Sequence, residues 1–79
     1  IRNKEKEEVD FLIADNNVPK LLIETKLSDD SPARALKHFQ DILGIPAVQL
    51  VNKEGVLKYI KNGQHTILIT TAHRWLSLL

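Results

Sequence analysis

The sequence predicts one α/β domain, with a mixed β-sheet, an N-terminal hairpin, one crossover helix and a C-terminal helix. Three observations predict this fold. Apolar and polar residues alternate along residues 8–14 and 20–27, as in two half-buried strands. Apolar residues then recur at helical spacing over residues 31–43. A short apolar segment at 47–51 follows this helix, which is the order of a right-handed β-α-β unit.

The N-terminal hairpin is predicted to pair residues 8–13 with residues 21–27. Asn16 and Asn17 tolerate left-handed backbone, so we place the turn at residues 16–18. The matching register pairs residues whose numbers add up to about 34, and Leu12 then faces Leu22.

The crossover helix has a predicted start and a predicted end. Ser31 is the expected N-cap and Pro32 the first helical residue. Gly44 follows the last apolar position, as a left-handed C-terminal glycine does. The apolar stripe that should face the sheet consists of Leu36, Phe39 and Leu43.

The remaining elements follow from apolar segments and turn residues. We expect a buried strand at 47–51, then a second hairpin whose strands, 56–60 and 66–71, flank Asn62-Gly63. Thr71 is the expected cap of a last helix at 72–79. The residues of that helix expected to dock on the sheet are Trp75, Leu76 and Leu79, with Arg74 in solvent.

Composition excludes several classes of protein. The chain has no cysteine, which rules out disulfides and thiolate metal sites. Its apolar runs are far shorter than the ~20 residues that span a bilayer, and it opens with no signal-peptide pattern. We therefore expect a cytoplasmic protein without membrane contact.

Charge is unevenly distributed along the chain, although its net value is +1. Residues 1–50 contain seven Lys or Arg and nine Asp or Glu, whereas residues 51–79 contain four and one. Chance alone can account for a charge difference that rests on counts this small. The alternative is a basic shelf beside an acidic site, and its members would be Lys53, Lys58, Lys61 and Arg74.

The N-terminal hairpin carries the candidate site. In the predicted register Asp10 lies directly opposite Glu24, with Cβ atoms ~5 Å apart. Two carboxylates this close need a neighbouring lysine, a shared proton or a divalent cation as a countercharge. Of the three, a divalent cation is the one that indicates a function, and Asp10 and Glu24 would then hold Mg²⁺ or Mn²⁺. Lys26 would orient the attacking water or stabilise charge on a phosphate.

The motifs around these residues are Glu-Val-Asp-Phe-Leu-Ile at 8–13, Leu-Ile-Glu-Thr-Lys-Leu-Ser at 22–28 and Pro-Ala-x-x-Leu at 32–36. They resemble the PD-(D/E)xK phosphodiesterase superfamily, which has the restriction-endonuclease-like fold. In a narrower form they resemble the uncharacterised C-terminal domain of a large family of prokaryotic AAA-type ATPases. Val9 departs from the superfamily pattern, which has Pro before the Asp.

The resemblance implies a restriction-endonuclease-like core without its N-terminal helix, and Mg²⁺-dependent hydrolysis of DNA or RNA. Asp10, Glu24 and Lys26 would be the catalytic residues, with Asp10 and Glu24 binding the metal. We expect residues 1–79 to form one nuclease-like domain, cut from the C-terminal end of a protein with its own N-terminal ATPase module. The alternative is a catalytically silent module of the same fold that docks a partner or regulates the ATPase. Homo-oligomers are compatible with both.

Simpler interpretations stand beside these. A register slipped by two residues puts Asp10 opposite Lys26, which makes an ordinary cross-strand ion pair. Gln40 and Gln49 are expected to be a solvent-facing helix residue and a half-exposed strand residue. The histidines have no metal-ligand spacing among themselves and are expected at the surface; they are His38, His65 and His73.

Overall fold

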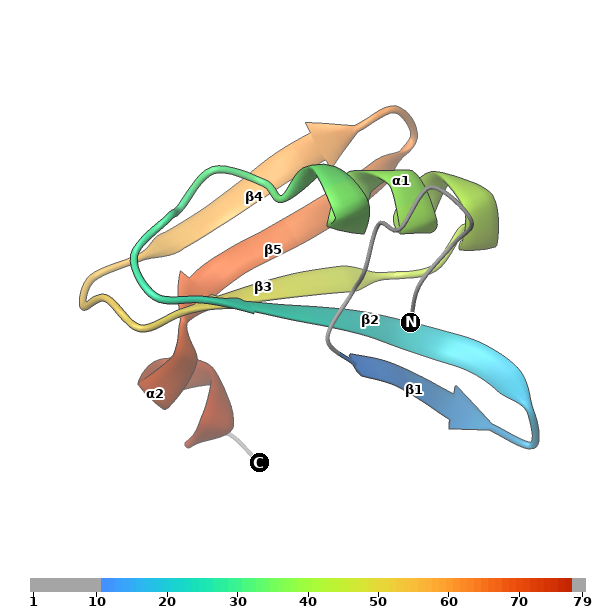
Figure 1. Ribbon diagram of the computed structural model, residues 1–79, viewed down its shortest axis with the longest axis horizontal. Coiled ribbons are helices and arrows are strands. Elements are labelled where there is room, and N and C mark those ends of the chain that lie inside the picture. Colours follow the sequence, from blue (N-terminus) through green and yellow to red (C-terminus); the bar gives the residue numbers. More distant parts are fainter. Residues whose placement is uncertain (1–10, 78–79) are drawn as a thin grey trace.

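The computed structural model describes residues 11–77, which form a five-stranded mixed sheet with two helices (Figure 1). In chain order the elements are β1 (Phe11–Asp15), β2 (Val18–Lys26), α1 (Arg34–Leu43), β3 (Ala47–Val51), β4 (Leu57–Asn62), β5 (His65–Thr71) and α2 (Ala72–Leu76). The strand order is β1-β2-β3-β5-β4. The three central strands are parallel, and each edge strand runs antiparallel to its neighbour. The predicted fold class is confirmed.

The first hairpin has the predicted register over its described part, since Phe11 pairs with Ile23 and Leu12 with Leu22. The predicted three-residue turn is wrong. A bulge between Ile13 and Ala14 shifts the register, and the turn is the pair Asn16-Asn17, with φ of 52° and 65°. Two successive left-handed residues match the twist of a tight hairpin, and asparagine accepts that conformation at low cost.

Helix α1 ends where the sequence predicts but begins later. Gly44 has φ of 64°, and its N–H donates to the Gln40 carbonyl at 2.7 Å, which closes the helix. The helix starts at Arg34 rather than Pro32, and the N-cap residue is Ala33, which offers no side-chain cap. Ser31 is therefore not the N-cap.

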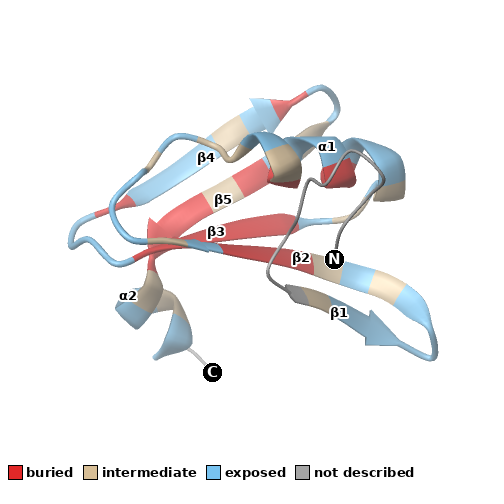
Figure 2. Cartoon of the chain, in the orientation of Figure 1, coloured by how far each residue is buried: buried red, intermediate tan, exposed pale blue. Residues whose placement is uncertain are grey.

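The main core lies between α1 and one face of the sheet. Its buried residues are Leu22, Leu36, Phe39, Ala47, Val51, Val56, Ile67 and Ile69. Figure 2 shows the buried residues gathered in the three central strands and on the underside of α1. Full burial of one such side chain stabilises the fold by about 1.5–3 kcal/mol, so this cluster fixes the position of α1.

The opposite face of the sheet is smaller and less covered. Its buried residues are Ile23, Val48 and Leu50, and Trp75 from α2 packs against them. Leu76 remains exposed, which contradicts its predicted docking, and Leu79 lies outside the described residues. No helix within residues 11–77 is long and apolar enough to cross a membrane.

The second hairpin forms one residue later than its turn signal. Asn62 pairs with His65, so the turn is Gly63-Gln64 rather than Asn62-Gly63. Gly63 takes the left-handed conformation, with φ of 63°. The hydroxyl of Thr71 does not cap α2; it donates to the Lys53 carbonyl at 2.7 Å and accepts the Val56 N–H at 2.9 Å.

Candidate functional site

Glu24 lies in the middle of the sheet on the face that α1 covers. Side chains alternate along β2, so Glu24 shares this face with Leu22, a member of the main core. Only 7% of Glu24 is exposed, and the residue paired with it in the parallel strand β3 is Gln49. Its Oε1 accepts the Thr25 N–H at 3.2 Å. A glutamate is therefore buried in the sheet, beside the buried amide of Gln49.

Lys26 is the last residue of β2 and lies on the same face as Glu24, two residues further along the strand. Its side chain is half-buried, and its carbonyl accepts the Asn52 N–H at 3.0 Å. Two residues of strand span about 6.5–7 Å. The Glu-x-Lys spacing thus places a glutamate and a lysine at successive positions of one strand face, near the carboxyl end of β2.

Asp10 lies outside the described residues, so its approach to Glu24 and Lys26 stays a prediction. The adjoining pairs are described: Phe11 faces Ile23 and Leu12 faces Leu22. The register slipped by two residues, which the ion-pair interpretation requires, is not the one found over residues 11–13.

Gln49 organises the loop that leaves the site, and its burial contradicts the expected half-exposed strand end. The side chain is fully buried. Its Oε1 accepts the Ala33 N–H at 2.8 Å, and its Nε2 donates to the carbonyls of Ser31 at 2.7 Å and Asp29 at 3.2 Å. These bonds hold the segment that leads into α1. The signal in the sequence was a lone amide inside a central apolar strand.

Gln40 forms a second buried amide network, at the other end of α1, instead of meeting solvent as expected. Its Nε2 donates to the carbonyls of Thr66 at 2.9 Å and Ile45 at 3.1 Å. Nδ2 of Asn62 donates to Oε1 of Gln40 at 2.9 Å and to the Lys37 carbonyl at 3.2 Å. Every partner is satisfied within the fold, so this network has a structural role.

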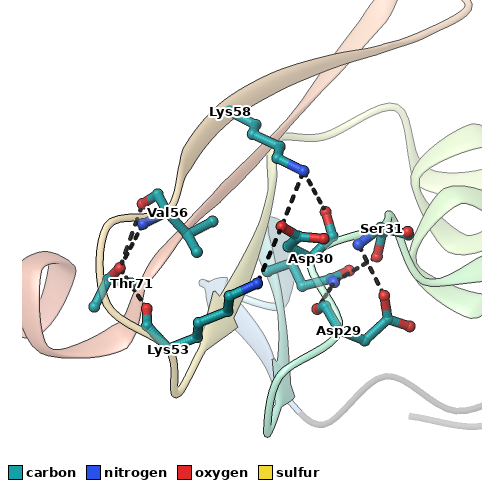
Figure 3. Close-up of polar contacts among 8 residues, drawn as sticks. Asp29, Asp30, Ser31, Lys53, Val56, Lys58 and Thr71 are labelled. Atoms are coloured by element: carbon teal, nitrogen blue, oxygen red, sulfur yellow. Dashed lines mark hydrogen bonds and ion pairs between the residues drawn. The ribbon is translucent and has the colours of Figure 1, made fainter.

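Asp30 joins the loop after β2 to β4 (Figure 3). Its carboxylate lies 3.1 Å from Nζ of Lys58 and 3.9 Å from Nζ of Lys53. The hydrogen bond and charge of Lys58, helped by the charge of Lys53, lower the pKa of Asp30 below its ordinary value. Two members of the predicted basic shelf are thus ion-paired, whereas Lys61 and Arg74 are exposed.

A shallow cavity of about 220 Å³ opens beside the carboxyl ends of β2 and β3. Its lining residues are Thr25, Lys26, Leu27, Leu50, Asn52 and Ala72. Two of these residues, Leu50 and Ala72, belong to the cluster on the face of the sheet opposite α1. Glu24 does not line it.

The magnesium site predicted at Asp10 and Glu24 stays a prediction, because Asp10 lies outside the described residues. Mg²⁺ takes one or two protein carboxylates and completes its shell with water and phosphate oxygens. Within residues 11–77 no group of three or more His, Asp or Glu side chains is placed to hold a metal. Glu24 is a suitable single ligand, and Asp10 is the predicted second one. His38, His65 and His73 lie on separate elements, none of them fully buried.

Comparisons of the chain with known protein families, with curated proteins and with solved structures find no match.

Proposed function

We propose that this chain is a nuclease domain that hydrolyses phosphodiester bonds in nucleic acid with Mg²⁺ or Mn²⁺. The observation that carries the proposal is a buried glutamate, Glu24, on the same strand face as a lysine two residues further along, Lys26. Buried charges are rare unless a partner or a metal compensates them.

Each residue has a chemical role in this proposal. Glu24, together with Asp10, would hold the metal through carboxylate oxygens. When bound, the metal polarises the phosphate and lowers the pKa of a coordinated water. Lys26 would orient that water or offset the negative charge that develops on the phosphate oxygens.

The surroundings suit a site that must be held rigidly. Gln49 anchors the loop at residues 29–33, and Asp30 ties the same loop to Lys58 of β4. Both contacts lie at the end of the sheet where Lys26 ends β2. A catalytic group positioned by such supports keeps its geometry when substrate binds, which is what phosphoryl-transfer chemistry requires.

The test is cleavage of supercoiled plasmid and of single-stranded RNA in the presence of Mn²⁺ or Mg²⁺. Glu24→Gln and Lys26→Ala should each abolish cleavage while the melting temperature in metal-free buffer stays close to that of the wild type. Matched controls are Glu54→Gln, an exposed glutamate, and Lys20→Ala, an exposed lysine on the same strand. Both controls should cleave like the wild type.

A second candidate is the catalytically silent module that docks a partner or regulates an ATPase. The observation that favours it is the outer edge of β4, which pairs with no further strand within residues 11–77 and carries exposed Leu57 and Tyr59. Metal binding discriminates the two. If the wild type cleaves neither substrate and its melting temperature ignores Mn²⁺, the nuclease proposal is wrong and the docking role is favoured.

A further inference from the structure

Asn62-Gly63 is the one Asn-Gly pair in the chain. An asparagine deamidates fastest when glycine follows it, because glycine has no side chain to hinder the attack of its nitrogen on the asparagine Cγ. The attack closes a five-membered succinimide ring and releases ammonia, and water then opens the ring to aspartate or isoaspartate. By sequence, the most reactive asparagine of the chain is therefore the one that ends β4.

The fold holds the side-chain amide of Asn62 away from this reaction. Only 9% of Asn62 is exposed, and its Nδ2 donates to Oε1 of Gln40 at 2.9 Å and to the Lys37 carbonyl at 3.2 Å. Both acceptors belong to α1, which packs on the main core. Ring closure has to break both bonds, because the amide nitrogen leaves as ammonia.

The backbone of Asn62 opposes the reaction as well. Asn62 is the last residue of β4 and pairs with His65 of β5. A residue in an antiparallel strand has ψ of about 135°. At that angle the nitrogen of the next residue is turned away from Cβ, whereas ring closure needs the two on the same side. The end of the hairpin must therefore open before Gly63 can attack.

We propose that Asn62 is a deamidation site that the closed second hairpin protects, so that the reaction occurs only while the end of β4 is detached from α1 and β5. Local opening has its own equilibrium within a folded protein. The native rate is then the rate of the unfolded chain multiplied by the fraction of open molecules. This inference concerns other residues than Glu24 and Lys26 and does not depend on the proposed nuclease activity.

The product does not fit where the amide was. An aspartate at position 62 presents acceptor oxygens to Oε1 of Gln40 and to the Lys37 carbonyl, which are acceptors too. Turning the Gln40 amide round would break the bonds that its Nε2 donates to the carbonyls of Thr66 and Ile45. Isoaspartate also adds a methylene to the main chain of β4. Deamidation therefore opposes reclosing of the hairpin.

The test compares the rate of Asn62 deamidation in the native chain and in denaturing guanidinium chloride, at mildly alkaline pH, by mass spectrometry of peptides. Conversion should be about tenfold slower or more in the native chain. Asn17→Gly is the matched control, since it creates a second Asn-Gly pair at 16–17 in an exposed turn whose left-handed backbone suits glycine. In the native variant, Asn16 should convert several times faster than Asn62.

Two further substitutions test the parts of the proposal separately. Gln40→Met keeps the volume but removes the acceptor, so Asn62 should convert faster in the native state, whereas Gln64→Met at the exposed turn should have no effect. Asn62→Asp should lower the melting temperature, and Asn52→Asp at an exposed position should not. The proposal is overturned if Asn62 converts equally fast in native and denatured chains, if Gln40→Met leaves its native rate unchanged, or if Asn62→Asp melts like the wild type.

Discussion

Gln49 is the residue whose position explains most about the candidate site. It stands beside Glu24 in the sheet and binds three backbone groups of the loop that leaves β2. The loop carries no regular structure of its own, so these bonds define its path. An amide suits the role because it accepts and donates at once.

We predict that Gln49→Leu lowers the free energy of unfolding by about 2–3 kcal/mol. Leucine fills a similar volume, so the loss comes from leaving the Ala33 N–H and two carbonyls without their partner. Urea denaturation measures it. Gln64→Leu, at an exposed turn position, is the control and should change stability by about 0.5 kcal/mol or less. Equal stabilities for the two variants would contradict the anchoring role of Gln49.

Glu24 and Lys26 could be identified from the sequence because they are two residues apart in one strand, and alternation then puts both side chains on one face. For Gln49 the sequence offered only an amide inside an apolar strand, and it gave no sign of the partners of Gln49 or Gln40. Their hydrogen-bond partners lie 16 or more residues away for Gln49, and up to 26 residues away for Gln40. Such partners become neighbours only through tertiary folding, so propensity and periodicity cannot reveal them.

At the scale of elements, the strands and the helix end were predictable and the helix start was not. Gly44 ends α1 through its own backbone conformation, a property of that residue alone. Before the start of α1, Ser31 and Ala33 are hydrogen-bonded to Gln49 of a different strand, a contact that the local preferences of Ser31 and Pro32 do not reveal. The prediction of a three-residue turn in the first hairpin was also wrong. The bulge between Ile13 and Ala14 shifts the register, which leaves two residues in the turn.

The ion pair of Asp30 with Lys58 couples the loop after β2 to the edge strand β4. Because its folded pKa lies below the ordinary value of 3.8, Asp30 stabilises the fold above that pH. The contribution is lost as pH falls from there through the lowered folded pKa. We therefore predict that Asp30→Asn lowers the melting temperature at neutral pH and that the difference from the wild type disappears in acid.

Thermal melts over a pH series measure this effect, with Lys58→Gln as the matched background. Most of the effect of Asp30→Asn should vanish in that background, because Lys58 is the main cause of the lowered pKa. A difference that persists unchanged in acid, or in the Lys58→Gln background, would show that the ion pair is not its source.

At the scale of the whole molecule, the fold places two surfaces at different parts of one small sheet. The carboxyl end of β2 carries Glu24 and Lys26 on the face that α1 covers. The outer edge of β4 carries Leu57 and Tyr59 on the opposite face. Substitutions at one of these places should therefore leave the other unchanged, because the two lie on opposite faces of the sheet.

The most direct measurement of the central claim is a Mn²⁺ titration followed by amide NMR, since a bound paramagnetic ion broadens the signals around it. We predict that broadening in the wild type centres on the amides of Glu24, Thr25 and Gln49, and that Glu24→Gln abolishes it. Broadening centred on Asp29 and Asp30 instead, or a pattern that Glu24→Gln leaves unchanged, would contradict a metal site at Glu24.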